Sequence, residues 1–254
     1  MDNFRILNIL FFFLVNTEIH VFRMLDIIQR HFPQARLWPE VTGEYLHKIS
    51  TDYHIPLPKV LFASCVCPDE LNYRATNFNN SFPHAFNLGG LAGIPYTGKT
   101  GMAAYASHVP ADGASFIFYG SHVGIHSDGS IGIVHREHQQ EPTYSCGALL
   151  SVLEHMRNEI PFDWSTNNFE DLQARVIEKL LHSHKERIFS SEQYVLEAVR
   201  IIFDMSGCLI RQFVMESKSS FPCKHVFLLG GIIINTDVGM ENYVEIQSFE
   251  HIEW

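Results

Sequence analysis

The chain has 254 residues, 46% of them hydrophobic and 18% charged, so it can bury the core of an α/β domain and is not expected to be disordered. Its formal net charge is −10, and its 18 lysines and arginines form no dense run, which argues against nucleic acid as a main partner. Five cysteines, an odd number in a long chain, favour thiols or metal ligands over a secreted disulfide framework.

The N-terminal segment allows two interpretations. Residues 6–15, ILNILFFFLV, are too few to span a bilayer as a helix, but they match the length of a signal-peptide core. Asp2 and Arg5 precede this run and no small-residue cleavage site follows it. The alternative is a first helix packed on the domain, or a leader before an internal start at Met24. We therefore treat residues 1–34 as a helical or leader segment, predict no transmembrane span, and leave the compartment open, with an organelle as one option.

Apolar periodicity predicts regular elements from residue 19 to residue 236. In chain order they are a helix at 19–29, a helix at 38–50, a strand at 59–67, a helix at 101–108, strands at 114–122 and 130–137, helices at 146–157, 169–188 and 191–216, and a strand at 225–236. Strands that alternate with helices predict an α/β fold, with a sheet of parallel strands flanked by helices. We expect residues 35–254 to form a single domain.

Residues 93–100, GIPYTGKT, match the phosphate-binding pattern G-x-x-x-x-G-K-[ST]. No apolar strand precedes them, Pro95 removes a backbone N–H from the loop, and Gly101 is a weak residue for opening a helix. The long Gly-, Asn- and Pro-rich loop at 76–101 is typical of a functional segment. We therefore expect no nucleotide at Gly93–Thr100, and a loop shaped for another purpose.

Soft metal ligands stand at the ends of three predicted elements. Cys67 ends the first strand and His122 ends the second, where ligands bind in open α/β sheets. Cys146 begins a helix, whose positive dipole end favours a thiolate. Two thiolates and one imidazole form a catalytic zinc set if a fourth position stays open. Each residue also has a plainer interpretation, as a small core residue or a hydrogen-bonded loop residue, and the separations match no zinc-finger pattern.

Asp69, two residues after Cys67, can reach the open position of a metal or its bound water. Arg74 can pair with this carboxylate and hold it ionised. Asp69 also fits the N-cap of a following helical turn, and both roles can hold together. A thiol redox protein is a weaker alternative, because Cys65 and Cys67 form C-x-C within an apolar strand rather than C-x-x-C.

Several segments of the chain resemble the limiting-carbon-dioxide-inducible B/C family, a divergent branch of the β-type carbonic anhydrases. They are CPDELNYR at 67–74, NLGGLAGIPYTGKTGMAAYASHVPADG at 87–113, YGSHVGIHSDGSIGIVHRE at 119–137, YSCGALL at 144–150 and LLGGIIINT at 228–236. The resemblance covers about residues 35–240. Its glycine-rich stretch and its CGA motif are the most specific parts, and the family carries a similar glycine loop with no nucleotide role.

The resemblance implies a β-carbonic-anhydrase-like, zinc-binding domain that interconverts carbon dioxide and bicarbonate as a homodimer. It implies that Cys67, His122 and Cys146 hold Zn²⁺, and that zinc-bound hydroxide is the nucleophile, oriented by Asp69 and an arginine. Leu71 occupies the arginine position of ordinary β-type enzymes. Arg74 is therefore the candidate partner of Asp69, and Arg136 is the reserve.

Two further groups of residues are candidates for supporting roles, each with a plainer interpretation as core or loop. Phe62, Phe86 and Leu88 are candidates for an apolar carbon dioxide pocket. For proton relay the candidates are His84, His108 and His126. Since resemblance does not guarantee turnover, the alternative function is a catalytically inactive, zinc-stabilised binding or assembly protein of the same fold.

Overall fold

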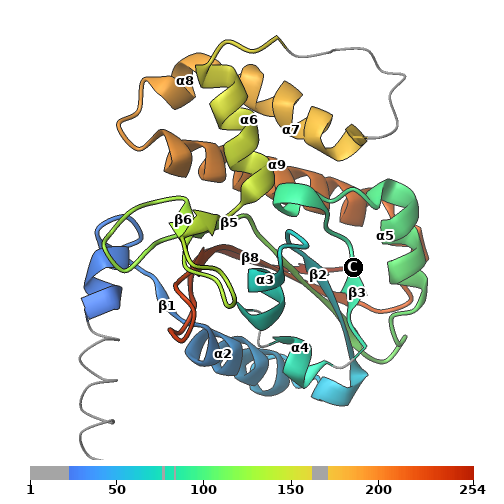
Figure 1. The fold of residues 1–254 in the computed structure, drawn as a ribbon. Helices are drawn as coiled ribbons and strands as arrows, with labels where there is room; N and C mark the ends of the chain where they lie inside the picture. The colour runs from blue at the N-terminus through green and yellow to red at the C-terminus, as the bar shows by residue number, and fades with distance from the viewer. Residues whose placement is uncertain (1–22, 76–77, 83, 162–170) are drawn as a thin grey trace, which may run out of the picture.

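The computed structural model describes residues 23–75, 78–82, 84–161 and 171–254. These residues build a seven-stranded sheet in the spatial order β1–β9–β8–β4–β2–β3, with β5 also paired to β8 (Figure 1). Its strands are β1 Arg36–Leu37, β2 Val60–Cys65, β3 Phe86–Asn87, β4 Ala114–Tyr119, β5 His122–Gly124, β8 His225–Asn235 and β9 Tyr243–Glu253. A separate small hairpin pairs β6 Ile133–Val134 with β7 Thr143–Tyr144.

The middle of the sheet is parallel and buried on both faces. β2 pairs in parallel with β3 and β4, and β8 pairs in parallel with β4 and β5. Every residue of β4 is buried, as are all those of β8 after His225. A parallel strand covered on both faces needs an apolar residue at nearly every position, which is why VFLLGGIII has no polar side chain and ASFIFY has only one before its tyrosine, Ser115. The predicted α/β fold with mostly parallel strands flanked by helices is confirmed.

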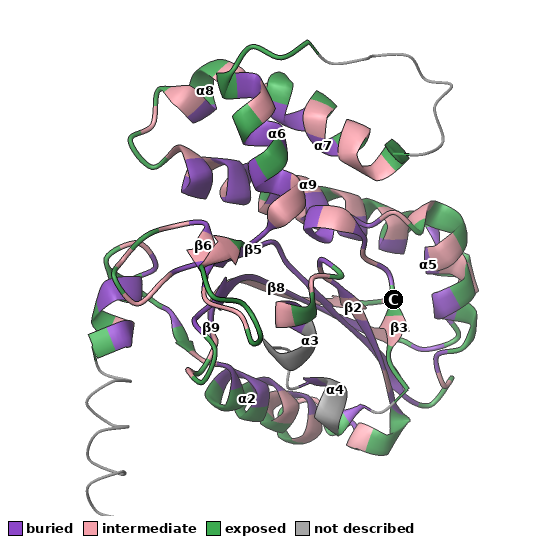
Figure 2. Cartoon of the chain, viewed as in Figure 1, coloured by how far each residue is buried: buried purple, intermediate pink, exposed green. Residues whose placement is uncertain are grey.

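Helix α2, Trp38–Thr51, covers one face of this sheet. Its buried residues follow helical spacing and begin with Trp38, Val41 and Tyr45. The Trp38 ring packs edge-on against Phe118 of β4, with 5.1 Å between ring centroids. Figure 2 shows this buried stripe on the sheet side of α2.

The other face carries most of the remaining helices, with α9 laid directly across the sheet and α5 beside it (Figure 1). The short helix α4 is an exception, because its Phe78 packs against Trp38 on the α2 face. Outside α9 lie α6, α7 and α8, which pack on it and on one another. The bounds are α3 Glu70–Ala75, α4 Phe78–Ser81, α5 Gly98–Ser107, α6 Gly147–Arg157, α7 Leu172–His182, α8 Lys185–Phe189 and α9 Tyr194–Glu216, with 3₁₀ turns at Leu57–Lys59, Leu91–Gly93 and Lys218–Ser220. No helix in the described part of the chain is long and apolar enough to cross a membrane.

Several predicted elements are shorter than expected or divided. The strand predicted at 59–67 ends at Cys65, so Cys67 lies beyond it in irregular backbone and does not share a strand face with Cys65. The strand predicted at 114–122 is broken after Tyr119, and His122 opens β5 instead of ending β4. Only Ile133–Val134 remains of the strand predicted at 130–137.

The remaining differences concern two predicted helices and one strand. The helix predicted at 169–188 is divided into α7 and α8, and its first residues lie outside the described part. Of the helix predicted at 19–29, residues 23–29 are helical, while residues 1–22 are outside the described part. The strand β9 was not predicted. It runs antiparallel to β8 over nearly its whole length and completes the sheet beyond the parallel strands.

Candidate metal centre

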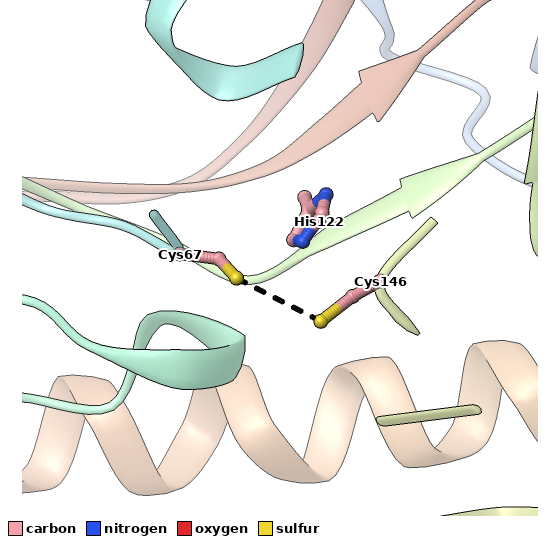
Figure 3. A group of neighbouring side chains, drawn as sticks. All are labelled: Cys67, His122 and Cys146. Atoms are coloured by element: carbon pink, nitrogen blue, oxygen red, sulfur yellow. Dashed lines mark hydrogen bonds between the residues drawn. The ribbon is translucent and has the colours of Figure 1, made fainter. Parts of the chain in front are cut away.

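Three turns of the chain bring Cys67, His122 and Cys146 together. Cys67 follows the end of β2, His122 begins β5, and Cys146 is the N-cap residue of α6. Each side chain offers one ligand atom, and these atoms all lie within 4.8 Å of one another, with 3.8 Å between the two sulfurs. Figure 3 shows the two thiols facing each other below the imidazole. All three residues are at least 96% buried, so the donor set is closed off from bulk water.

The His122 ring is oriented by a hydrogen bond on the side away from the sulfurs. Its Nδ1 lies 2.8 Å from Oδ1 of Asn235, the last residue of β8. Because an amide oxygen only accepts, Nδ1 carries the proton and Nε2 keeps its lone pair. Nε2 is buried and has no hydrogen-bond partner among the described residues. An orphaned lone pair beside two sulfurs is what a metal ligand requires, and the Asn235 contact is the outer partner such a histidine usually has.

The two cysteines are not equivalent. A hydrogen bond from Cys67 lowers the pKa of Cys146 against the opposing effect of burial, and the backbone N–H groups of Leu149 and Ala148 in the first turn of α6 lower it further. The hydrogen bond to Cys146 and burial both raise the pKa of Cys67. Cys146 is therefore the more readily ionised thiol, as expected for a helix N-terminus.

The charge around His122 favours a cation. Burial by itself lowers the pKa of His122, but the neighbouring Cys67 sulfur and Asp69 carboxylate outweigh it and raise that pKa. The same negative surroundings stabilise a positive ion at Nε2. Two sulfurs and one imidazole nitrogen match the donor preference of zinc, so the residues present fit that metal.

Asp69 is held beside this centre by Arg136, the reserve candidate. Arg136 donates from Nη1 to Oδ1 at 3.0 Å and from Nη2 to Oδ2 at 3.1 Å. Burial raises the pKa of Asp69, yet the bonds from Arg136 and the nearby His122 keep it below its ordinary value. Asp69 also accepts from the Leu71 N–H at the start of α3, so it caps that helix as well.

Arg136 is fixed in place by further contacts. It donates from Nε to Thr143 Oγ1 at 3.0 Å and from Nη2 to the Tyr144 carbonyl at 2.7 Å, and it forms an ion pair with Glu70. The side chain of Arg74, the first candidate, lies outside the described residues. The bidentate partner of Asp69 in the structure is therefore Arg136, and Arg74 has no assigned role.

The glycine-rich loop packs against the centre. Gly93 has a φ of +87°, and a Cβ on it would lie 2.2 Å from the carbonyl oxygen of Gly120, two residues before His122. The Gly93 carbonyl accepts from the Cys65 thiol at 3.4 Å and from the Ser206 hydroxyl of α9 at 3.1 Å. The lysine of the GKT match, Lys99, forms an ion pair with Glu216. Gly93, the first glycine of the GIPYTGKT match, therefore packs against the backbone that leads to His122.

Gly93→Ala is expected to cost about 2–5 kcal/mol of unfolding free energy, because left-handed strain adds to a clash with backbone. The matched control is Gly98→Ala, which also has a positive φ, of +60°, but has nothing within 4 Å of the added Cβ. That change is expected to cost only about 1–2 kcal/mol. Urea unfolding measures both, and equal losses would show that Gly93 is not restrained by Gly120.

Sequence reasoning missed the polar residues behind the ligands. The Asn235 amide donates to Asn72 Oδ1 at 3.4 Å, and the Asn72 amide donates to the Cys67 carbonyl at 3.1 Å. These two buried amides link His122 to the backbone of Cys67. Ser145 Oγ donates to Asn235 Oδ1 at 3.2 Å. A signal was present, because Asn235 is a polar residue at the C-terminal end of an apolar strand, where ligand-binding groups gather.

The supporting candidates lie in different surroundings. Phe62 packs among aromatic rings on the α2 face, and Leu88 lies in the core beneath α5, so neither belongs to the buried cluster that contains Cys67 and Cys146. Phe86 packs on Tyr105 and is partly buried.

The three histidines that are candidates for proton relay differ in exposure. His84 and His108 are exposed, and His126 is half-buried beside Asp128 and Asp237.

Comparison with known proteins gives one family match and several similar structures. The family model described as limiting CO2-inducible proteins B/C β-carbonic anhydrases matches residues 46–253. The crystal structure of PtLCIB4, a homolog of the limiting CO2-inducible protein LCIB, is 23% identical with a TM-score of 0.82, over 90% of this chain and 95% of that one. The structure of LCIB itself is 16% identical with a TM-score of 0.67, over 87% and 92%. No curated protein matches the sequence.

Proposed function

The chain belongs to the limiting CO2-inducible B/C family of β-carbonic anhydrases, and on that premise we propose that it is a zinc-dependent carbonic anhydrase that interconverts carbon dioxide and bicarbonate. Cys67, His122 and Cys146 would hold the zinc ion. Asp69 and Arg136 would orient the attacking group. The single observation that carries the proposal is the environment of His122: its buried Nε2 has no hydrogen-bond partner among the described residues, and its ligand nitrogen lies within 4.8 Å of both cysteine sulfurs.

The position of Asp69 distinguishes a catalytic site from a purely structural one. A structural zinc site has four protein ligands, whereas a catalytic site leaves one position for water. Both carboxylate oxygens of Asp69 accept hydrogen bonds from Arg136, and Asp69 is not part of the group of ligand atoms that lie within 4.8 Å of one another. With three protein ligands, and with the Asp69 carboxylate held by Arg136, the proposed centre would leave its fourth position to a small oxygen ligand.

A bound zinc ion would supply Lewis acidity that brings the pKa of a water towards neutrality, the known effect in carbonic anhydrases. The residues of the chain do the remaining work. Asp69 stays ionised because of Arg136, so it can only accept a hydrogen bond and would orient the lone pair of the attacking oxygen towards carbon dioxide. The buried walls around Cys67 and Cys146 exclude bulk water, which strengthens these interactions.

Asn235→Ala is expected to weaken zinc binding by about 10–100-fold, because His122 would lose the acceptor that fixes its tautomer and ring orientation. Asn87→Ala is the matched control, since Asn87 is an exposed strand-end asparagine whose Oδ1 accepts from the Gly89 backbone N–H. Competition with a fluorescent zinc chelator measures both affinities. An Asn235→Ala protein that binds zinc as tightly as the unmodified chain would remove Asn235 from the centre.

Stopped-flow carbon dioxide hydration on the zinc-quantified protein tests the proposed function. The expected result is turnover that rises in proportion to zinc content, disappears after chelation and returns when zinc is restored. A protein that holds one zinc ion per chain and shows no turnover across neutral pH would refute the enzyme and support the alternative, an inactive zinc-stabilised binding or assembly protein.

We further propose that the chain forms a homodimer, the assembly that its resemblance to the family implies. Sedimentation velocity over a range of protein concentrations tests this part separately. A sedimentation coefficient of a 29.1 kDa monomer at every concentration would contradict it without affecting the metal centre.

A further inference from the structure

Two histidines and a glutamate meet at the far end of β8 from the metal centre. His225 begins β8 and lies opposite Glu253, the last residue of β9, while His251 lies opposite Phe227. Successive residues of a strand point to alternate faces, so this register places the three side chains on one face of the sheet. Their ligand atoms all lie within 4.8 Å of one another.

We propose that His225, His251 and Glu253 form a second metal site, which binds a divalent transition-metal ion such as zinc. Nδ1 of His225 lies 3.0 Å from Nε2 of His251. Two nitrogen ligands of a tetrahedral zinc ion are about 3.3 Å apart, so the nitrogens need to separate only slightly. Two imidazoles and one carboxylate form a common zinc ligand set, with a fourth position left for water.

Packing holds the central ligand in place. The His251 ring stacks on Phe227 with 4.7 Å between centroids and an interplanar angle of 20°. Tyr53 packs edge-on against the same ring, with 4.5 Å between centroids. Because these contacts fix the imidazole before any ion binds, little side-chain entropy is lost on binding.

The direction of the His251 pKa shift also suits a metal ligand. Burial lowers the pKa of His251, and the adjacent His225 lowers it further against the opposite effect of Glu253. A lowered pKa favours the neutral imidazole, the form of histidine that ligates metals. The 3.0 Å contact is also a hydrogen bond between the rings, so a bound ion would take the place of that single proton.

This site is separate from the proposed carbonic anhydrase centre. The eleven residues of β8 rise about 3.3 Å each, so its two ends lie more than about 30 Å apart, with Asn235 of the first centre at one and His225 at the other. An ion at the second site would join β8 to β9 and stabilise the folded chain in proportion to its concentration. Its oxygen and nitrogen ligands predict weaker zinc binding than at the thiolate centre.

Equilibrium dialysis of the full-length, zinc-loaded protein against a series of zinc concentrations tests the proposal. The unmodified chain is expected to bind one zinc ion beyond the one held by Cys67, His122 and Cys146. His251→Phe, which keeps a ring against Phe227, and His225→Gln are each expected to weaken this additional binding by at least about tenfold. Unchanged additional binding in both variants would overturn the site.

Two controls separate this result from the proposed function. Cys146→Ser is expected to lose the tight ion and keep the weaker one, so failure of the first centre would leave the second measurable. His138→Gln changes an exposed histidine outside the cluster and is expected to bind as the unmodified chain does. If His251→Phe does not fold, Glu253→Gln, at the exposed end of β9, provides the test, and unchanged affinity in that variant would also overturn the site.

Discussion

Asp69→Asn is expected to lower carbon dioxide turnover by at least about 100-fold while zinc stays bound. The asparagine has nearly the same shape, but its amide group can donate a hydrogen bond where the carboxylate only accepts. It also weakens the paired bonds from Arg136 that keep Asp69 ionised and fixed. Stopped-flow hydration, with zinc content measured on the same samples, would show whether turnover and metal content separate.

Asp112→Asn is the matched control for this change. Asp112 also forms an ion pair, with Lys59, but both residues are exposed and precede β4 and β2, at the opposite end of these strands from the centre. It is expected to keep both zinc and turnover. An Asp69→Asn protein with full activity would show that the carboxylate does not orient the reacting oxygen.

Cys146→Ser is expected to abolish both tight zinc binding and turnover. A serine hydroxyl does not ionise near neutral pH, so the centre would lose the thiolate that the first turn of α6 favours. One nitrogen and one sulfur would then remain as ligands, too few for a stable tetrahedral zinc site. Zinc content after dialysis, measured by atomic emission, tests the first part, and stopped-flow hydration tests the second.

Cys223→Ser is the control for loss of a buried thiol. The Cys223 thiol donates to the His225 carbonyl, an interaction that a serine hydroxyl can also make, and Cys223 is not part of the ligand group. It is expected to leave tight zinc binding unchanged. If Cys146→Ser kept zinc as firmly as Cys223→Ser, the centre would have to use other ligands.

Local pattern predicts much of this fold because its central elements are strongly amphipathic or wholly apolar. The apolar runs in β4 and β8 and the helical spacing in α2 and α9 are set by burial, which a sequence displays directly. Cys67 and Cys146 stand close to element ends, and in a parallel sheet such ends converge at one edge. The grouping of Cys67, His122 and Cys146 could therefore be predicted from the sequence.

The remaining features depend on contacts that local pattern does not encode. Most residues of β9 are half-buried, so buried and exposed positions do not alternate along it. The alternation of apolar and polar residues that predicts a strand is therefore weak in this segment. The break before His122 lies at a contact between distant segments, because a Cβ on Gly120 would lie 2.1 Å from the Gly231 carbonyl of β8. Arg136 reaches Asp69 from a loop far along the chain, whereas sequence proximity favoured Arg74.

The most direct test of the central claim is oxygen-18 exchange between labelled bicarbonate and water at chemical equilibrium, comparing the unmodified protein with Cys146→Ser at equal concentration. The account predicts that the zinc-loaded unmodified chain accelerates loss of label from carbon dioxide well above the uncatalysed rate and that Cys146→Ser does not. Loss of label at the uncatalysed rate in both proteins, with zinc present in the first, would contradict it.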